Sequence, residues 1–404
     1  MARLAFIPLL VGCGSPSAPP VSGSTPGTPR PPRIVSAKLV GDPVFYRRQG
    51  DLWMNTWADD DNLYMSWGDG TGRGDCCVSF GDGPADNTPT CVPVPDTVSL
   101  EDVYENWDPQ VCIDNNYCCC RFTDAGVTIF ETAPMAPSSC EGECVVGLHV
   151  PNGISPIAAD GTVQDRSDKP SSLLFVDGTL YWAGHYPLGT PTHGYIAYSN
   201  DYGRDWTEET NTPWDASTPF RVMMFINMGK AYSLNTDGYV YALAMGRETG
   251  WSSADGAAED GTVYLARVPK GDIADYAAYR YFAGTDAAGN PDFRPAITDA
   301  RPLAGLKAYM QGSAIYHPGT GQYLFLTSAP GDLYAAPEPW GPWQEVSNVL
   351  GDSALPANWP AGGYIPGLIT KGADANHVYF TISGVDGIEH YQLTMGEIEL
   401  TVAP

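Results

Sequence analysis

The stretch Asp51-Leu-Trp-Met-Asn-Thr-Trp57, Ala58-Asp-Asp-Asp-Asn62, Leu63-Tyr-Met-Ser-Trp-Gly-Asp69-Gly70 decides how the chain is interpreted. Two runs of apolar and aromatic residues flank a polar turn centred on Asp60, a pattern that predicts a β-hairpin. Folding the chain at Asp60 places Asp51 opposite Asp69, and such cross-strand partners have Cβ atoms about 4.5–5.5 Å apart. Retaining glycosidases hold their two carboxyl groups about 5–5.5 Å apart. The hairpin therefore fits two interpretations, a pair of catalytic carboxylates or two solvated residues closing an ordinary hairpin.

The composition favours short strands joined by turns. The 404 residues include 45 Gly, 36 Pro, 23 Tyr and 11 Trp, and 17% of them are charged, which suits β-structure better than helices. The net charge of −26 repels nucleic acid and anionic lipid, so we expect no nucleic-acid partner. A saline habitat would produce the same acidic bias, and the composition does not separate the two causes.

Residues 1–13 predict a lipoprotein signal peptide. Arg3 supplies a basic start, an apolar run follows, and Leu10-Val-Gly-Cys13 resembles a bacterial lipobox, in which the cysteine is lipidated. Residues 14–33 form a tether rich in Pro, Ser and Thr. We expect an exported bacterial lipoprotein, at the cell surface or in the outer membrane and periplasm, that touches the membrane only through a lipid at Cys13. The alternative is a soluble N-terminus with a chance match.

Cysteine usage agrees with export. The chain has 10 cysteines, and all except Cys13 lie between Cys76 and Cys144. Such local density predicts a disulfide-rich insertion over residues 71–144. The cysteines other than Cys13 number nine, which is odd, so at least one of them is left without an intramolecular disulfide partner. Zinc binding with nearby His149 is the alternative, but the paired CxxC spacing of zinc ribbons is missing. We therefore expect neither a metal nor another cofactor.

From residue 171 the chain repeats units of roughly fifty to eighty residues with about four strand-like runs each. Tight Gly-containing turns, such as Val176-Asp-Gly-Thr179, separate the first two runs of several units. The hairpin would be the first unit. The other units have runs at 171–176, 180–186, 195–199 and Trp206; at 230–234, 239–245, 262–268 and 279–283; at 313–316, 322–326, 332–336 and 343–346; and at 364–370, 377–382, 389–393 and 398–402.

Repeated four-stranded units with little helix predict an all-β fold, a five-bladed β-propeller over residues 34–404 that carries the insertion in its first blade. The early run at 34–40 would complete the last blade and close the ring. Two β-sandwiches are the alternative. The segment Ser199-Asn-Asp201-Tyr-Gly203-Arg-Asp-Trp206 also fits the S-x-D-x-G-x-x-W Asp box of sialidase-like propellers. That box caps the turn between the third and fourth strands of a blade and is structural rather than catalytic.

Polar residues from different blades are expected to meet at one mouth of the propeller. The starts of first strands and the ends of second strands lie at the same end of each hairpin, and Asp51 and Asp69 occupy these positions in the first. The same rule selects as substrate-binding candidates Asp168, Lys169, His185, Asn227, Lys230, Gln311 and Tyr364, with Arg247 and Ser313 at related positions. Each candidate also has an ordinary structural explanation, such as packing for His185, a turn cap for Asp168 or a surface position for Lys230.

The D-x17-D spacing from Asp51 to Asp69 resembles the five-bladed propeller glycoside hydrolases that include bacterial endo-D-arabinanases and their uncharacterised relatives. Further similar stretches are Lys169-Pro-Ser-Ser-Leu-Leu174, Phe225-Ile-Asn-Met-Gly-Lys230, Asp237-Gly-Tyr-Val-Tyr241, Tyr264-Leu-Ala-Arg-Val-Pro269 and Pro339-Trp-Gly-Pro-Trp343. The resemblance covers residues 34–404 outside the cysteine-rich insertion, and it implies that Asp51 and Asp69 are the catalytic carboxylates. Two departures bear on the substrate: Gly70-Thr71 follows the Gly-Asp pair, and the insertion begins directly behind Asp69.

The leading hypothesis is hydrolysis of a glycosidic bond in an extracellular polysaccharide, with an arabinofuranoside as one candidate. One carboxyl group would protonate the leaving oxygen, and the other would act as nucleophile or as base through water. The alternative is a non-catalytic surface propeller for glycan binding or adhesion. We expect a carbohydrate partner and a monomer. A sialidase would need an arginine triad, which the Arg positions do not assemble at the mouth.

Overall fold

The structure is a computed structural model that describes residues 33–70, 123–130, 134–135, 169–186, 193–203, 206–209, 211–246, 261–328, 330–351, 353–359, 361–384 and 392–403. For residues 47–49, 69–70 and 123–130 it describes the backbone alone. The predicted signal peptide with Cys13, the tether up to residue 32, and all cysteines of the insertion lie outside the described residues. Asp168, Arg247 and the side chain of Asp69 also lie outside them.

The described chain is almost entirely β-structure, which confirms the predicted all-β class. Strands form four sheets, and no helix among the described residues is long and apolar enough to span a membrane. One sheet pairs, in order, β2 (Asn55–Trp57), β3 (Leu63–Gly70) and β4 (Thr123–Phe130). A second sheet pairs, in order, β5 (Lys169–Val176), β6 (Thr179–Tyr186), β7 (His193–Ser199) and β8 (Thr207–Glu208).

The largest sheet joins two antiparallel meanders through one parallel pair, β9 with β14, in which Ala314 lies beside Ile226 and Ile315 beside Asn227. Its strands in order of pairing are β13 (Pro291–Arg294), β12 (Arg280–Thr285), β11 (Tyr264–Pro269), β10 (Tyr239–Met245), β9 (Val222–Asn227), β14 (Gly312–His317), β15 (Gln322–Thr327), β16 (Asp332–Ala336) and β17 (Gln344–Asn348). Short 3-10 turns are η1 (Lys230–Tyr232), η2 (Lys270–Asp272), η3 (Tyr276–Ala278) and η4 (Ile297–Asp299).

The fourth sheet brings the two ends of the described chain together. It consists of β1 (Arg33–Gln49), β20 (Gln392–Ala403), β19 (His377–Ser383) and β18 (Tyr364–Ile369) in that order. The early run therefore does complete the last sheet, as predicted. The runs predicted separately at 389–393 and 398–402 are instead joined in β20 from Gln392 onward. Gly396 lies inside that strand, where the rings of Trp359 and Phe380 leave no room for a Cβ.

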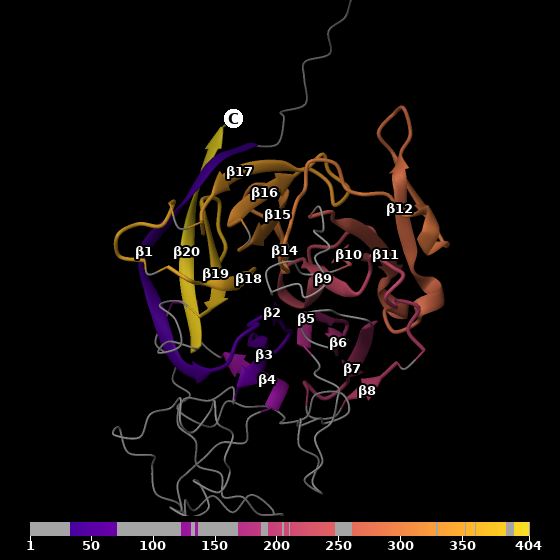
Figure 1. The fold of residues 1–404 in the computed structure, drawn as a ribbon, viewed down its shortest axis with the longest axis horizontal. Helices are drawn as coiled ribbons and strands as arrows, with labels where there is room; N and C mark the ends of the chain where they lie inside the picture. The colour runs from indigo at the N-terminus through magenta and orange to yellow at the C-terminus, as the bar shows by residue number, and fades with distance from the viewer. Residues whose placement is uncertain are drawn as a thin grey trace, which may run out of the picture.

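The sheets are arranged around a common centre, where the first strands of the meanders meet (Figure 1). Contacts run from β2 to β5, from β5 to β9, from β9 to β14, from β14 to β18, and from β18 back to β2. These five inner strands form a closed ring, and their sheets extend outward from it. The ring defines two ends, one where the inner strands start and one where they finish.

The prediction for the inner strand of the third unit is wrong. The prediction was a strand at 230–234, but β9 occupies Val222–Asn227 and the later segment turns through η1. All six residues of β9 are buried, so its sequence lacks the apolar–polar alternation of a half-exposed strand. Positive φ angles at Gly229, Ala231 and Tyr232, of 72°, 48° and 61°, exclude a strand at the predicted place.

The hairpin register also differs from the prediction. Asn55 pairs with Met65, and that register would place Asp51 opposite Asp69. Asp51 instead bridges Gly68, with backbone hydrogen bonds of 2.9 and 2.8 Å. The chain shifts by one residue because Leu52 takes a φ of 57° and its carbonyl accepts from the Met54 N–H at 2.7 Å. The prediction that the two aspartates face each other directly across the hairpin is therefore wrong.

The Ser199–Trp206 segment forms the turn between β7 and β8. Ser199 Oγ donates to Asp201 Oδ1 at 2.7 Å and accepts from the Gly203 N–H at 2.7 Å. Trp206 Nε1 donates to the Gly203 carbonyl at 3.0 Å, and its ring lies edge-on to Trp182 at 6.1 Å. One buried hydroxyl thus organises the turn and fixes an aromatic ring against the sheet.

We predict that Ser199→Ala lowers the free energy of unfolding by about 1–3 kcal/mol, because the substitution removes both hydrogen bonds from a buried turn. Urea denaturation measures the change. The matched control is Ser36→Ala at an exposed position of β1, which we expect to change stability by less than about 0.5 kcal/mol. Equal stability of the two variants would contradict the role given to Ser199.

Candidate active site

Five of the predicted site residues meet at the end of the ring where the inner strands start. The Tyr364 hydroxyl, at the start of β18, donates to Asp51 Oδ2 at 3.0 Å. Gln311, just before β14, donates from Nε2 to the carbonyl of Pro170 at 2.9 Å, next to Lys169 at the start of β5. His185 joins them because it pairs with Lys169 across β5 and β6. The structure therefore brings Asp51, Lys169, His185, Gln311 and Tyr364 to this end of the ring.

Asp51 is the central member of this group. Its exposed fraction is only 3%. Its backbone N–H donates to the Gly68 carbonyl, and its carbonyl accepts from the Gly68 N–H. Burying a carboxyl group is costly unless hydrogen bonds compensate for the lost water. The Tyr364 hydroxyl provides one such bond. A buried carboxyl at the meeting point of several sheets indicates a position kept for chemistry or binding rather than for solubility.

The backbone on either side of the Asp51–Tyr364 contact is strained. Leu52 directly follows Asp51 with a φ of 57°, and Ile365 directly follows Tyr364 with a φ of 49°. Such angles are rare for residues with branched side chains and cost about 1–3 kcal/mol each. Ser383 Oγ accepts from the Leu52 N–H at 3.1 Å, and Ser328 Oγ accepts from the Ile365 N–H at 3.0 Å. No sequence pattern signalled either strained residue or these two hydroxyls.

His185 is buried beside two polar neighbours. Its Nδ1 lies 2.8 Å from Ser171 Oγ, while its Nε2 makes no hydrogen bond to any described residue. Burial, reinforced by the positive charge of Lys169, lowers the pKa of His185 to about 3. The imidazole is therefore neutral at physiological pH, and it acts as a hydrogen-bonding group rather than as a cation.

Two predicted site residues lie elsewhere, and the prediction that they share the mouth with Asp51 is wrong. Asn227 ends β9, where its Oδ1 accepts from Thr56 Oγ1 at 2.8 Å and its Nδ2 donates to backbone carbonyls. Lys230 follows it and pairs with Asp61 at 3.0 Å. Both lie toward the finishing end of the inner strands, because β9 starts at Val222 rather than at residue 230.

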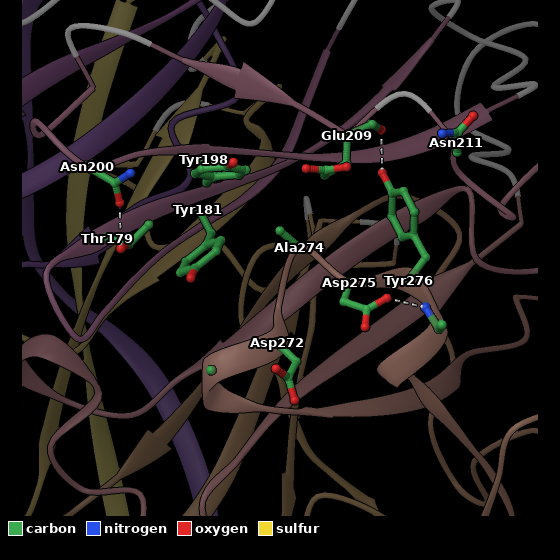
Figure 2. A pocket seen from close by; sticks show the side chains of 12 residues that line it. Thr179, Tyr181, Tyr198, Asn200, Glu209, Asn211, Asp272, Ala274, Asp275 and Tyr276 are labelled. Atoms are coloured by element: carbon green, nitrogen blue, oxygen red, sulfur yellow. Dashed lines mark hydrogen bonds between the residues drawn. The ribbon is translucent and has the colours of Figure 1, made fainter.

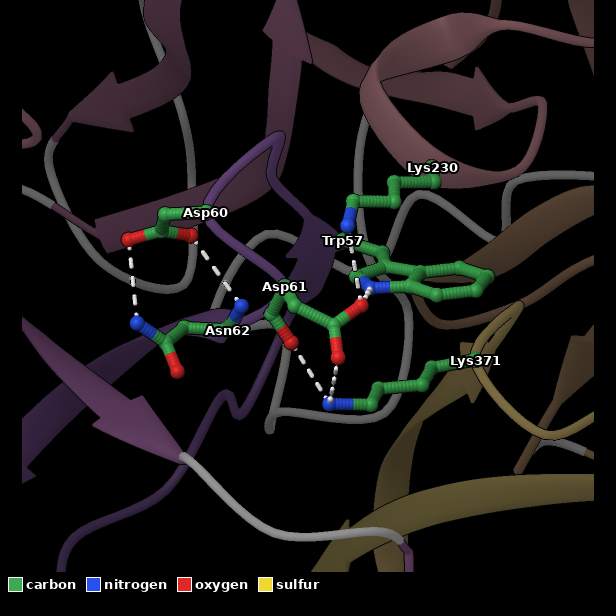
Figure 3. A network of polar contacts seen from close by, with 6 residues as sticks. All are labelled: Trp57, Asp60, Asp61, Asn62, Lys230 and Lys371. Atoms are coloured by element: carbon green, nitrogen blue, oxygen red, sulfur yellow. Dashed lines mark hydrogen bonds and ion pairs between the residues drawn. The ribbon is translucent and has the colours of Figure 1, made fainter.

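That finishing end is closed by an ionic contact centred on Asp61 (Figure 3). Its carboxylate pairs with Lys230 at 3.0 Å and Lys371 at 3.6 Å and also accepts from Trp57 Nε1 at 3.0 Å. Hydrogen bonds from Lys230 and then Trp57 lower the pKa of Asp61. The hairpin tip is thereby connected to the segments after β9 and β18. We name this set, Trp57, Asp61, Lys230 and Lys371, the Asp61 clasp.

Other predicted site residues lie outside what the structure describes. Asp69 directly follows Gly68 in β3, and Gly68 is the residue that bridges Asp51. The backbone of Asp69 therefore lies near Asp51, but its side chain is not described. Asp168 and Arg247 are also outside the described residues, and Ser313 lies buried in β14. Within the described ranges, no group of three His, Cys, Asp or Glu side chains is arranged to hold a metal ion.

We predict that His185 destabilises the protein as the pH falls. Its pKa is about 3 in the native state but about 6.5 in an unfolded chain. The unfolded state therefore binds more protons between these values, and stability is lost as the pH drops below about 6.5. Comparing urea denaturation at pH 7 and pH 5, we expect His185→Gln to lose less stability than the wild type. An imidazole NMR signal of His185 titrating near pH 6.5 would contradict this account.

We predict that Asp61→Asn lowers the melting temperature at pH 7, because the two lysines lose their shared carboxylate. Since the native pKa of Asp61 is lowered, its contribution is present above the unfolded value of about 3.9 and is lost as the pH falls through the native value. The difference from the wild type should therefore vanish in strong acid. Asp177→Asn, in the exposed turn between β5 and β6, is the control. A difference that persists unchanged at acidic pH would contradict the clasp.

Comparison with solved structures shows similar folds at low sequence identity. A protein described as a "putative hydrolase" from Bacteroides ovatus has 11% identity and a TM-score of 0.50, with 86% of this chain and 85% of that chain covered. A GH43 β-xylosidase/α-arabinofuranosidase from a compost microbial metagenome, in complex with xylotriose, has 13% identity, coverage of 92% and 94%, and a TM-score of 0.43. The GH93 α-L-arabinofuranosidase of Fusarium graminearum, with arabinobiose, has 9% identity, coverage of 91% and 98%, and a TM-score of 0.35.

At 11% identity, the similarity to the Bacteroides ovatus protein bears on the fold alone. No curated protein sequence matches the chain. A family model described as "Domain of unknown function (DUF4185)" matches residues 160–395. The match begins before β5 and ends within β20, so it includes all the inner strands except β2. Because it spans more than half of the sequence, the chain belongs to the DUF4185 family.

Proposed function

We propose that this protein is a glycoside hydrolase whose chemistry takes place at the end of the ring where the inner strands start. One observation carries the proposal: Asp51, a carboxyl group only 3% exposed, is held there by Tyr364 between two strained backbone positions. Strained backbone and buried titratable groups concentrate at functional sites. The resemblance of the Asp51–Asp69 spacing to propeller glycoside hydrolases supports the same assignment.

In this proposal Asp69 supplies the second carboxyl group. Its backbone adjoins Gly68, which bridges Asp51. One carboxyl group protonates the oxygen of the leaving sugar. The other attacks the anomeric carbon if the two groups are about 5–5.5 Å apart, or activates a water molecule if they are about 6.5–9.5 Å apart. Because of the one-residue shift at Leu52, Asp51 and Asp69 are not direct cross-strand partners. The distance between their carboxyl groups therefore depends on the backbone conformation around Leu52 and Gly68.

Lys169, His185, Gln311 and Tyr364 are the proposed substrate-binding residues. They offer donors and acceptors of different kinds: an ammonium group, a neutral imidazole, an amide and a phenol. Such a mixed set suits the hydroxyl groups of a sugar, which both donate and accept hydrogen bonds. Gln311 and Lys169 have exposed fractions of 0% and 1%, so their positions are fixed by packing before any substrate binds. Asn227 and Lys230 have no part in this set.

The finer features follow as proposals. The ring of inner strands β2, β5, β9, β14 and β18 supports five blades, with β1 completing the last one. We further propose an exported lipoprotein, anchored through Cys13 and tethered by residues 14–33, that acts on extracellular polysaccharide as a monomer. The substrate class that the resemblance favours is an arabinofuranoside. Arabinan and xylan are the first test substrates, because arabinobiose and xylotriose occupy two of the similar solved structures.

We predict that Asp51→Asn and Asp69→Asn each lower kcat by about 10²–10⁴-fold on a polysaccharide that the wild type cleaves, because each removes a group that transfers a proton or attacks the sugar. Release of reducing sugar from arabinan and xylan measures the effect. Asp177→Asn, exposed in a turn distant from this end, is the control and should retain wild-type turnover.

Wild-type turnover in both Asp51→Asn and Asp69→Asn would overturn the assignment of the carboxyl pair. Glycan binding by the wild type without product, and without any effect of either substitution, would establish the non-catalytic alternative instead. The anomeric configuration of the first product, followed by NMR, then distinguishes retention from inversion.

A further inference from the structure

A cavity of about 690 Å³ is lined by Thr179 and Tyr181 of β6, Tyr198 of β7 and residues of the turns η2 and η3 (Figure 2). Its walls come from the start of β6, the end of β7, the segment after β8, and the turns η2 and η3. His185 is at the other end of β6 from Thr179, and six residues of extended strand correspond to about 20 Å. The cavity volume is within the range of about 300–1,000 Å³ that small-molecule sites occupy.

Two tyrosines form a platform on one wall of this cavity. Tyr181 and Tyr198 are direct cross-strand partners on β6 and β7. Their ring centroids are 6.4 Å apart and their planes are tilted by 44°, so the rings lie side by side instead of enclosing a point. Burial raises the pKa of Tyr181, and its hydroxyl therefore remains a donor at neutral pH. Such a platform suits a flat ligand with an apolar face.

The opposite wall is held in place by Tyr276. Its hydroxyl donates to the Glu209 carbonyl at 2.8 Å and accepts from the Ile196 N–H at 2.9 Å. This single phenol therefore connects η3 with β7 and with the segment after β8. Because the cavity is built from separate elements that are hydrogen-bonded to one another, it exists before any ligand arrives.

The charged groups of the cavity are carboxylates, which accept hydrogen bonds. The carboxylates of Glu209 and Asp272 make no hydrogen bond or ion pair with any described residue, and both line the cavity with Asn211. None of the described residues that line it is basic. Together with the net charge of −26, this lining repels anions. Ionised carboxylates can each accept from two neighbouring hydroxyl groups, and an asparagine side chain both donates and accepts.

We propose that this cavity, lined by Tyr181, Tyr198, Glu209, Asn211 and Asp272, is a second binding site for a neutral saccharide. One face of a sugar ring is rich in C–H groups and would lie on the tyrosine platform, while its hydroxyl groups donate to the carboxylates. A small cation would be held best by rings arranged as a cage, and the side-by-side tyrosines do not form one. The site requires no hydrolysis at Asp51, and it would hold a glycan chain at a distance from that residue.

Isothermal titration calorimetry of the full chain with soluble arabinan, xylan, anionic polygalacturonate and tetramethylammonium tests the proposal. We expect at least one neutral polysaccharide to bind, and neither charged probe. Tyr198→Ala removes half of the platform. Gly271→Phe places a ring at the cavity wall, and it should fold because a Cβ at Gly271 meets no atom within 4 Å. We expect each variant to raise the Kd at this site at least tenfold. Phe45→Ala, which removes an exposed aromatic ring elsewhere (39% exposed), is the matched control.

Asp51→Asn separates this site from the proposed active site. Under our proposal that variant keeps the binding that Tyr198→Ala and Gly271→Phe lose, whether or not it has lost turnover. Binding of neutral polysaccharide that neither cavity variant weakens would overturn the second site, as would binding of tetramethylammonium alone or no binding by any polysaccharide. Loss of all binding in Asp51→Asn alone would place the whole interaction at the end of the ring where Asp51 lies.

Discussion

The structure depends on how the inner strands satisfy their backbone groups where they meet. Among the described inner strands, regular pairing joins only β9 to β14, so side chains must supply other hydrogen bonds at a buried centre. Thr56 Oγ1 accepts from the Phe175 N–H at 3.0 Å and donates to Asn227 Oδ1 at 2.8 Å. Asn227 Nδ2 then donates to the carbonyls of Asn55 and Leu173 at 3.2 and 3.1 Å. Two short side chains thus connect β2, β5 and β9, and loss of either would leave buried polar groups without partners.

This constraint makes the two ends of the ring different. Toward the finishing end, polar side chains are engaged with backbone or with each other, and the Asp61 clasp joins the hairpin tip to the segments after β9 and β18. At the starting end, buried Asp51 and its partner Tyr364 are each followed by a residue held in a strained backbone conformation, and His185 is also buried there. Strain of this kind persists only where surrounding contacts enforce it, here through Ser328 and Ser383. The difference between the ends is the structural basis for assigning function to the starting end.

Much of the strand order was predictable because Gly-containing turns mark where strands begin, as Gly238 does before β10 and Gly331 before β16. The predicted runs 239–245 and 332–336 coincide with β10 and β16. The errors arose where such patterns are absent. Strand β9 directly follows Phe220-Arg221 and has no glycine turn before it, so its start was misplaced and Asn227 and Lys230 were assigned to the wrong end. The register shift at Leu52 depends on a backbone angle that leucine rarely adopts. The Asp61 clasp joins residues separated by more than a hundred positions, which local patterns do not reveal.

The most direct test of this account is an experimental structure of the Asp51→Asn protein with an arabino- or xylo-oligosaccharide bound. We predict a sugar ring at the starting end of the inner strands, within hydrogen-bonding distance of position 51 and of at least one of Lys169, His185, Gln311 and Tyr364. A sugar bound beside the Asp61 clasp instead, with the starting end empty, would contradict it.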